Sequence, residues 1–183
     1  MDKKKSIRKI YLDKRKKFFF GIKENFFNPL KKIIKKRSNK KNLNIALYYP
    51  SNFEVNVLKI FDIQYFKRFK FLLPIIKKSN SMDFHIWRKN DILCLNKYGI
   101  LEPIKSLKVE PSVILVPLIA FDKNKNRIGY GKGYYDKILN KYSNLNKRVL
   151  SIGVAFSFQK YNKIPINSKD FKLDYIITEK GII

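Results

Sequence analysis

The hydrophobic positions of this 183-residue chain alternate between a helical period and short continuous apolar runs. Residues 3–37 carry apolar side chains at helical spacing, and Gly21 divides this stretch into two predicted helices. A polar turn is expected at residues 37–42. The apolar run 43–50 then predicts a short strand, and the pattern of residues 54–69 predicts a helix.

The rest of the chain contains the longest apolar runs. Strands are expected at residues 69–76, 92–103 (a strand followed by a turn), 112–121, 148–156 and 174–179, with a helix ending near Asn146. The central strands are apolar on both faces and alternate with helices, which is typical of a mostly parallel sheet covered on both sides. We therefore predict one domain over residues 1–183, an α/β fold built as a Rossmann-like three-layer α/β/α sandwich.

One stretch has a composition that core packing does not explain. Residues 127–139 read RIGYGKGYYDKIL and lie between the most strand-like run and a predicted helix. In open α/β sheets, ligands bind beyond the carboxyl ends of the strands, which is where this stretch falls. Its spacing is G-x-G-x-G, which is not the dinucleotide fingerprint. It is not the Walker pattern either, because Gly133 stands where a hydroxyl is required.

The physical chemistry of this stretch still favours an anion. Glycines allow backbone N–H groups to face a phosphate, and the following helix N-terminus adds positive potential. Lys132 adds a full charge, and Arg127 offers a planar fork for phosphate oxygens. The stretch predicts a phosphate-bearing ligand. The alternative is a glycine-rich turn with an incidental lysine.

The net charge of +27 suggests nucleic acid at first sight. However, 34 of the 41 basic residues are lysine and 17 residues are asparagine, as AT-rich codons would produce, and the lysines spread along the whole chain. We therefore expect no specific nucleic-acid partner, and keep a basic nucleic-acid-binding module as the alternative function. Such a field would still steer polyanionic ligands.

The remaining composition excludes several classes of protein. No run of about 18 uncharged apolar residues exists, so no membrane span is expected. The N-terminus lacks the apolar segment of an export signal. Cys94 is the single cysteine, which excludes an internal disulfide, and we expect it to be a buried strand residue. These features favour a cytoplasmic protein, and we expect a monomer.

The glycine stretch belongs to a longer resemblance. The segment VPLIAFDKNKNRIGYGKGYYDKIL is similar to the signature of the 5-formyltetrahydrofolate cyclo-ligase family, also called methenyltetrahydrofolate synthetase. KKSIR, YYPSNFEVN, LLPII, YGILEP, IGVAFSFQ and KDFKLDYIITEKG follow the family order along the whole chain. One departure is Leu118, where the family usually has glycine.

The resemblance implies an ATP-dependent carbon–nitrogen ligase. Its substrates would be ATP and 5-formyltetrahydrofolate, often polyglutamylated. Its products would be 5,10-methenyltetrahydrofolate, ADP and phosphate, formed with Mg²⁺ through a phosphorylated formyl oxygen. Such a reaction needs mainly the positioning of two anionic ligands and electrostatic stabilisation of a transferring phosphoryl group.

The resemblance also implies roles for individual residues. Lys132 and Arg127 would be catalytic, and Asp136 and Asp170 would bind Mg²⁺. The ATP site would comprise Lys4, Arg8, Arg127, Ile128, Gly129, Tyr130, Gly131, Lys132, Gly133, Tyr134 and Tyr135. The folate site would comprise Tyr49, Glu54, Tyr130, Gly131, Lys132, Gly133 and Tyr134.

Several interpretations compete with these roles. Tyr49 is also explained as a half-buried strand residue, Glu54 as a helix-start acid, and the two aspartates as a helix-start acid and a cap or turn. His85 is expected to be structural, whereas Trp87 is a candidate for lining the folate pocket. A folate-binding protein without turnover is a further alternative for the whole chain.

Overall fold

The structure is a computed structural model that describes residues 3–37, 42–77, 79, 81–104 and 106–183. Its helices are α1 (Lys3–Phe18), α2 (Asn28–Arg37) and α3 (Tyr134–Asn144), with 3₁₀-helices η1 (Glu24–Phe27), η2 (Val57–Asp62), η3 (Gln64–Phe66) and η4 (Ser157–Gln159). The strands are β1 (Asn44–Ala46), β2 (Lys70–Ile76), β3 (Met82–Ile86), β4 (Leu93–Leu95), β5 (Leu101–Pro103), β6 (Val113–Pro117), β7 (Ala120–Phe121), β8 (Arg127–Ile128), β9 (Leu150–Val154), β10 (Tyr175–Thr178) and β11 (Gly181–Ile182).

A seven-stranded sheet forms the centre of the fold, in the order β11-β10-β9-β6-β1-β2-β3. The five inner strands are parallel, and β3 and β11 are antiparallel additions at the two edges. In register, Ile45 of β1 lies between Phe71 and Val113. From β1 the chain first builds outward to β2 and later returns to β6 on the other side. The point between β1 and β6 is therefore the topological switch point, where α/β sheets bind ligands.

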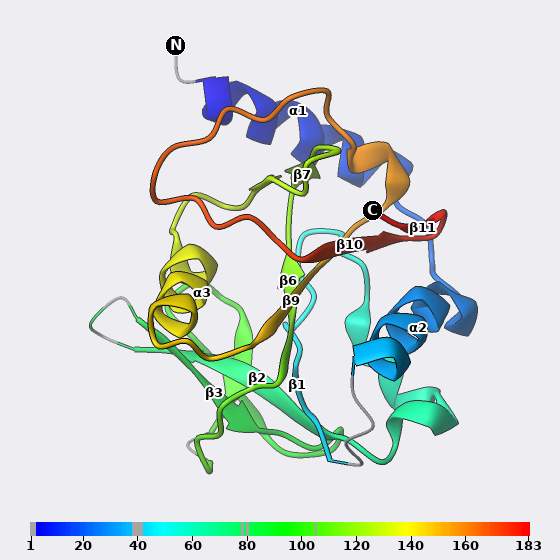
Figure 1. Cartoon of the computed structure of the whole chain (residues 1–183), viewed down its shortest axis with the longest axis vertical. Coiled ribbons are helices and arrows are strands. Elements are labelled where there is room, and N and C mark those ends of the chain that lie inside the picture. Colours follow the sequence, from blue (N-terminus) through cyan, green and yellow to red (C-terminus); the bar gives the residue numbers. More distant parts are fainter. Residues whose placement is uncertain (1–2, 38–41, 78, 80, 105) are drawn as a thin grey trace.

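Alternation along the strands creates a core on each face of the sheet. Ile45 and Leu47 face the core that α2 covers, together with η1 and η2, whereas Ala46 faces the core under α3. Figure 1 shows α2 and α3 on opposite sides of the sheet and α1 across the end that the glycine stretch occupies. A third, smaller cluster, which includes Ile7 and Tyr11, joins α1 to β7 and β8. The predicted α/β class with a mostly parallel sheet is confirmed.

The helix predicted over residues 54–69 is wrong. The chain forms the 3₁₀-helices η2 and η3 there instead. Its apolar side chains recur every three residues, at Val57, Ile60, Ile63, Phe66 and Phe69, and all of them contact the core. A spacing of three is the period of a 3₁₀-helix rather than of an α-helix, so this conformation buries four members of the row and leaves Ile63, between the two helices, half-buried.

The two predicted helices of residues 3–37 are confirmed as α1 and α2, while residues 38–41 of the predicted polar turn lie outside the described residues. The run 112–121 is not one strand, because β6 ends at Pro117 and β7 begins at Ala120. The Gln159 side chain donates to the carbonyls of Leu118 and Ile119, both at 2.9 Å, and so pairs the backbone that leaves the sheet.

Residues 92–103 form a two-stranded hairpin, β4 and β5, rather than a strand followed by a turn. The expectation that Cys94 is buried is wrong, since it is exposed on β4. Strand β3 was not predicted, although it pairs with five residues of β2. Among the described residues, no helix has both the length and the apolar character that crossing a membrane requires.

Candidate active site

The glycine stretch forms a loop between β8 and α3, at the carboxyl end of β6. Gly131 has a φ of 92° and Gly133 a φ of 70°, conformations that residues with a Cβ rarely adopt. A Cβ on Gly131 would also lie 3.3 Å from Cζ of Arg8. Gly133 is the residue before α3, so the loop leads directly into a helix whose first N–H groups have no intrahelical partners. Backbone donors and a helix N-terminus therefore meet here, as the sequence predicted.

The tip of this loop is open to solvent. Lys132 is exposed, and its Nζ lies 5.5 Å from the ring centre of Tyr98. Tyr98 is in the turn of the β4–β5 hairpin, and its hydroxyl lies 2.7 Å from the hydroxyl of Tyr134. No carboxylate among the described residues forms an ion pair with Lys132. Its charge is thus available to a ligand, and Tyr98 is a neighbour that sequence reasoning missed.

The base of the loop is buried and interlocked. Arg127 donates from Nη1 to the carbonyl of Phe171 and from Nη2 to Oδ1 of Asp136, both at 2.8 Å. The backbone N–H of Phe171 donates to the same Asp136 oxygen at 3.1 Å. Burial lowers the pKa of the Arg127 guanidinium, an effect that the Asp136 carboxylate opposes. In this structure Arg127 therefore fixes the start of the loop to Phe171 and Asp136 through its hydrogen bonds. Its predicted contact with phosphate oxygens stays a prediction.

Helix α1 brings two predicted ATP contacts to the loop. Lys4 forms an ion pair with Asp170, and Nε of Arg8 donates to the carbonyl of Gly129 at 2.8 Å. Ile7 and Tyr11 are buried on the same side of the helix, and the Tyr11 hydroxyl donates to the carbonyl of Lys160 at 2.8 Å. Because these positions are three or four residues apart, they share one face of α1.

The same face of α1 carries a residue that sequence reasoning missed, Arg15. It is 1% exposed, and its Nη2 lies 2.5 Å from the hydroxyl of Tyr130. That hydroxyl donates to Oε1 of Glu54 at 2.9 Å, and Oε2 of Glu54 accepts from the backbone N–H of Ser51 at 2.9 Å. A helix, the glycine loop and the segment after β1 are thus joined by one hydrogen-bonded chain. The four- and seven-residue spacing from Lys4 to Arg8 to Arg15 was the available sequence signal.

Burial raises the pKa of Glu54, and Arg15, Ser51 and Tyr130 act in the opposite direction. Glu54 lies near the hydroxyls of the buried Tyr48 and the half-buried Tyr135, and loss of solvation raises the pKa of both groups. Tyr49 is half-buried at the edge of the α2-side core, so its predicted contact with folate stays a prediction.

Asp136 and Asp170, the predicted magnesium ligands, both lie beside the loop base. The hydrogen bonds that the structure gives them end on Oδ1 of Asp136 and on Oδ2 of Asp170. Each carboxylate therefore keeps a second oxygen, and hard oxygen ligands suit Mg²⁺. In the described part of the chain, no group of three or more metal-ligating side chains exists. A magnesium ion here would need phosphate oxygens or water to complete its coordination, which is its usual habit.

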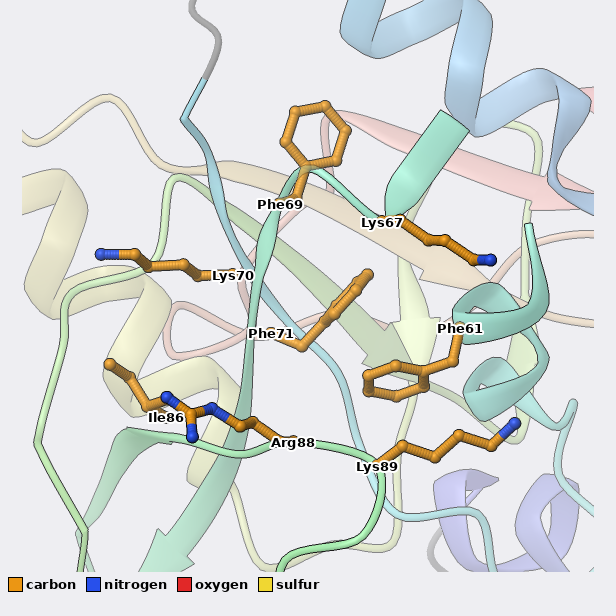
Figure 2. A pocket seen from close by; sticks show the side chains of 8 residues that line it. All are labelled: Phe61, Lys67, Phe69, Lys70, Phe71, Ile86, Arg88 and Lys89. Carbon is orange, nitrogen blue, oxygen red and sulfur yellow. The ribbon is translucent and has the colours of Figure 1, made fainter. Parts of the chain in front are cut away.

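A separate hollow of about 420 Å³ lies at the opposite end of β2 and is not this site. Figure 2 shows its lining residues: Phe61, Lys67, Phe69, Lys70, Phe71, Ile86, Arg88 and Lys89. Trp87 is buried in the core beside Phe61, with ring centres 5.3 Å apart. Trp87 lies at the start of β2, where its backbone N–H donates to the carbonyl of Phe71, and its predicted contact with folate stays a prediction. His85 is bonded through Nδ1 to the carbonyl of Ser106 at 2.6 Å, which agrees with a structural role.

The fold and the loop together define a class of protein. A glycine-rich loop joins the region beyond a buried parallel strand to a helix N-terminus, beside the switch point, as in α/β enzymes that bind phosphate. Comparison with known proteins narrows this class. Residues 1–179 match the 5-formyltetrahydrofolate cyclo-ligase family, and the chain belongs to that family.

Relatives and solved structures agree with the match. The chain is 30% identical over 157 residues to a probable 5-formyltetrahydrofolate cyclo-ligase of Schizosaccharomyces pombe, covering 76% of each protein. It is 35% identical over 135 residues to the 5-formyltetrahydrofolate cyclo-ligase of Mycoplasma genitalium, covering 73% of this chain and 71% of that protein. The NMR structure of Aquifex aeolicus 5,10-methenyltetrahydrofolate synthetase matches with a TM-score of 0.72 and 30% identity, over 98% of this chain and 91% of that one.

Proposed function

We propose that this protein converts 5-formyltetrahydrofolate and ATP into 5,10-methenyltetrahydrofolate, ADP and phosphate. The observation that supports the proposal is that residues from three separate segments meet at the switch point. There, the glycine loop with Lys132 meets Glu54 from the segment after β1 and the cationic face of α1. One side of this meeting point suits a triphosphate, and the other offers a carboxylate to a second ligand. Membership of the family supports the assignment of folate to that second ligand.

The proposed reaction has two bond-forming steps. The formyl oxygen attacks the γ-phosphorus of ATP, so an O–P bond forms and the bond to ADP breaks. The second folate nitrogen then attacks the activated formyl carbon, its proton is released, and the carbon–oxygen bond breaks as phosphate departs. Little acid–base chemistry is needed from the protein, because phosphoryl transfer depends mainly on positioning and on electrostatic stabilisation.

The loop and α1 supply the cations for phosphoryl transfer. Lys132 and the N–H groups before and within the first turn of α3 would face the phosphates, with Ile128, Gly129 and Tyr135 holding the loop around them. Arg8 already lies against Gly131 and would add a second positive charge beside that of Lys132. Lys4 would exchange Asp170 for phosphate oxygens when the nucleotide arrives. Positive side chains at fixed positions stabilise the charge that develops on the transferring group.

Glu54 and Tyr130 would orient the folate, with Tyr49 and Tyr134 on either side of them. The tail of a polyglutamylated folate is a polyanion, and the net charge of +27 would draw it toward the protein. Asp136 and Asp170 would hold Mg²⁺, which when bound neutralises charge on the phosphate oxygens. Release of Asp170 from Lys4 would remove a competing cation from Oδ2, which would keep its hydrogen bond from the backbone N–H of Asn167, and Oδ1 would face the metal.

The decisive experiment is turnover of 5-formyltetrahydrofolate by the purified chain with ATP and Mg²⁺, followed by the near-ultraviolet absorbance of the methenyl product. Product that depends on ATP is expected. Tight folate binding without product would show a binding protein instead. Neither product nor folate binding, together with sequence-selective nucleic-acid binding, would overturn the proposal. Salt-dependent binding to random nucleic acid is expected of any chain this basic and would not decide the question.

A further inference from the structure

Arg15 is buried more completely than any cation that the family resemblance assigns to the site. Its exposure is 1%, and its other hydrogen bond runs from Nη1 to the carbonyl of Leu118 at 3.3 Å. Within the described residues, its Nε is buried without a hydrogen-bond partner. A buried guanidinium with an unused donor costs folding free energy, so a helix anchor alone does not account for it.

The hydrogen bonds of Arg15 fix the direction of a proton. A guanidinium has only donors, so the Tyr130 oxygen must accept from Nη2 of Arg15. The single hydroxyl proton of Tyr130 is then left to point at Oε1 of Glu54, 2.9 Å away. Ser51 donates to the other carboxylate oxygen. Glu54 therefore receives donors on both oxygens, which is the arrangement that suits an ionised carboxylate.

Each element packed around Glu54 contributes a group that affects its charge. Besides Tyr130 and Ser51, these are Arg15 from α1, Tyr48 from the end of β1 and Tyr135 from α3. Of these groups Arg15 alone carries a full positive charge, while Tyr48 and Tyr135 are neutral. The hydrogen bonds from Ser51 and Tyr130 also favour the ionised carboxylate, but Arg15 is the largest of the influences that oppose its burial.

We propose that Arg15 is a positioning residue that acts through Tyr130 to keep Glu54 ionised and directed toward the folate. This inference rests on the proposed function and deepens it, because it couples the helix that carries Lys4 and Arg8 to the folate side of the site. A ligand with N–H donors would be held by Glu54 only while the carboxylate is charged. Arg15 itself need not touch either substrate.

The test compares Arg15→Met with Arg15→Lys and with the control Lys16→Met, an exposed neighbour on α1. Arg15→Met is expected to raise the KM for 5-formyltetrahydrofolate about tenfold, the effect of losing one charge-assisted hydrogen bond. The KM for ATP should change less than about twofold. Arg15→Lys should recover part of the loss, because it restores the charge and one donor, and Lys16→Met should behave as wild type.

The pH profile separates positioning from anchoring. Glu54 is needed ionised, so folate affinity is present above its pKa and lost as the pH falls through it. Removing Arg15 raises that pKa further, so the acid limb of kcat/KM for folate should move to higher pH. A merely structural role would lower the melting temperature and change both KM values together, with the acid limb unmoved and no rescue by Arg15→Lys. That result would overturn the inference.

If Arg15→Met does not fold, Tyr130→Phe provides the same test with the guanidinium retained. It breaks the chain between Arg15 and Glu54, so the acid limb should again move to higher pH. An unmoved limb would contradict the inference. Because wild-type turnover is measured first, its absence would reject the proposed function itself. Active wild type with an Arg15→Met variant of unchanged folate KM would reject only the role of Arg15.

Discussion

The base of the glycine loop, at Arg127 and Asp136, and its tip, at Lys132, lie within ten residues of each other. They differ in whether the charged side chain has a partner within the protein. At the base, Arg127 is buried and its hydrogen bonds go to Asp136 and Phe171. At the tip, Lys132 projects between Gly131 and Gly133 and pairs with no acid in the described part of the chain. The base fixes where the loop is, and the tip leaves its charge for a ligand.

This difference shows that a charged residue in a phosphate loop has to be interpreted from its surroundings. Arg127 and Lys132 are equivalent in a list of basic residues, yet only Arg127 is itself buried and depends on a carboxylate, that of Asp136, for its counter-charge. A buried charge that loses its partner is strongly destabilising, whereas an exposed lysine contributes little to folding. The two regions should therefore separate when stability and turnover are measured on the same variants.

The largest effect on stability is expected at the base, from Asp136→Asn compared with Asp170→Asn. Both would weaken magnesium binding, but Asp136→Asn also leaves the buried Arg127 guanidinium without its carboxylate. It should cost about 3 kcal/mol and lower the melting temperature by about 10 °C. Asp170 pairs with Lys4, whose side chain is 18% exposed against 4% for Arg127, so Asp170→Asn leaves a better solvated cation behind and should lower the melting temperature less. Thermal unfolding and magnesium titration of both variants check this pair.

Equal melting temperatures for the two variants would contradict the view that the ion pair of Asp136 with the buried Arg127 holds the base of the loop more strongly than the ion pair of Asp170 with Lys4. Loss of turnover that extra Mg²⁺ restores in Asp170→Asn, but not in Asp136→Asn, would sharpen it. Such a result would show that Asp136 has a structural role in addition to any role in binding Mg²⁺.

At the tip the expected effect is on turnover alone. Lys132→Ala should reduce kcat by about 10²- to 10³-fold, the scale of losing one preorganised donor to developing charge, while the melting temperature stays unchanged. Lys132→Arg should recover only part of the rate, because a planar fork does not reproduce a compact ammonium. Lys123, exposed in the turn between β7 and β8, is the matched control, and Lys123→Ala should be near neutral. Similar rates for the two alanine variants would mean that Lys132 contributes only to a diffuse field.

The same comparison shows which features of this molecule could be predicted from the sequence: local patterns could be predicted, and contacts between distant segments could not. The five parallel strands of the sheet, α1, α2, α3 and the position of the loop were readable, because long apolar runs and glycine spacing are local signals. The edge strands β3 and β11 were not. The partners of Arg127 were not readable, since Phe171 comes from a segment more than forty residues away. The Arg15–Tyr130–Glu54 chain joins three separate segments for the same reason. The 3₁₀ row at residues 57–69 was missed because a period of three was taken for an α-helical pattern.

Gly153 of β9 offers a control that lowers stability without touching either region. A Cβ at this position would lie 2.8 Å from terminal side-chain carbons of Leu118 and Leu173, both of which are buried in the core. Gly153→Ala should therefore cost about 1–3 kcal/mol by overpacking. Turnover per folded molecule should stay near wild type, as measured by kcat corrected for the folded fraction. A large loss of kcat in the folded enzyme would mean that the base responds to packing as well as to charge.

The pair Leu118 and Gly153 adds a second arm to this measurement. This chain has Leu118 where the family usually has glycine, and Leu118 occupies the space that a side chain at position 153 would need. Leu118→Ala should make Gly153→Ala less costly, so the double variant should be more stable than the sum of the two single changes. Additive effects in this double-mutant cycle would show that the added methyl group clashes with Leu173 and its other neighbours rather than with Leu118.

The smallest effect is expected at Tyr98, under the tip. Tyr98→Phe removes the hydroxyl that lies 2.7 Å from Tyr134 but keeps the aromatic ring near Nζ of Lys132. Because both hydroxyls are near solvent, water replaces the lost hydrogen bond, and the melting temperature should not change. If the ring alone positions the lysine, kcat should fall no more than about threefold, whereas Tyr98→Ala should fall further because the cation–π contact is lost as well. Equal kcat values for the Phe and Ala variants would show that Tyr98 does not hold the tip, and that the glycine backbone alone sets where Lys132 points.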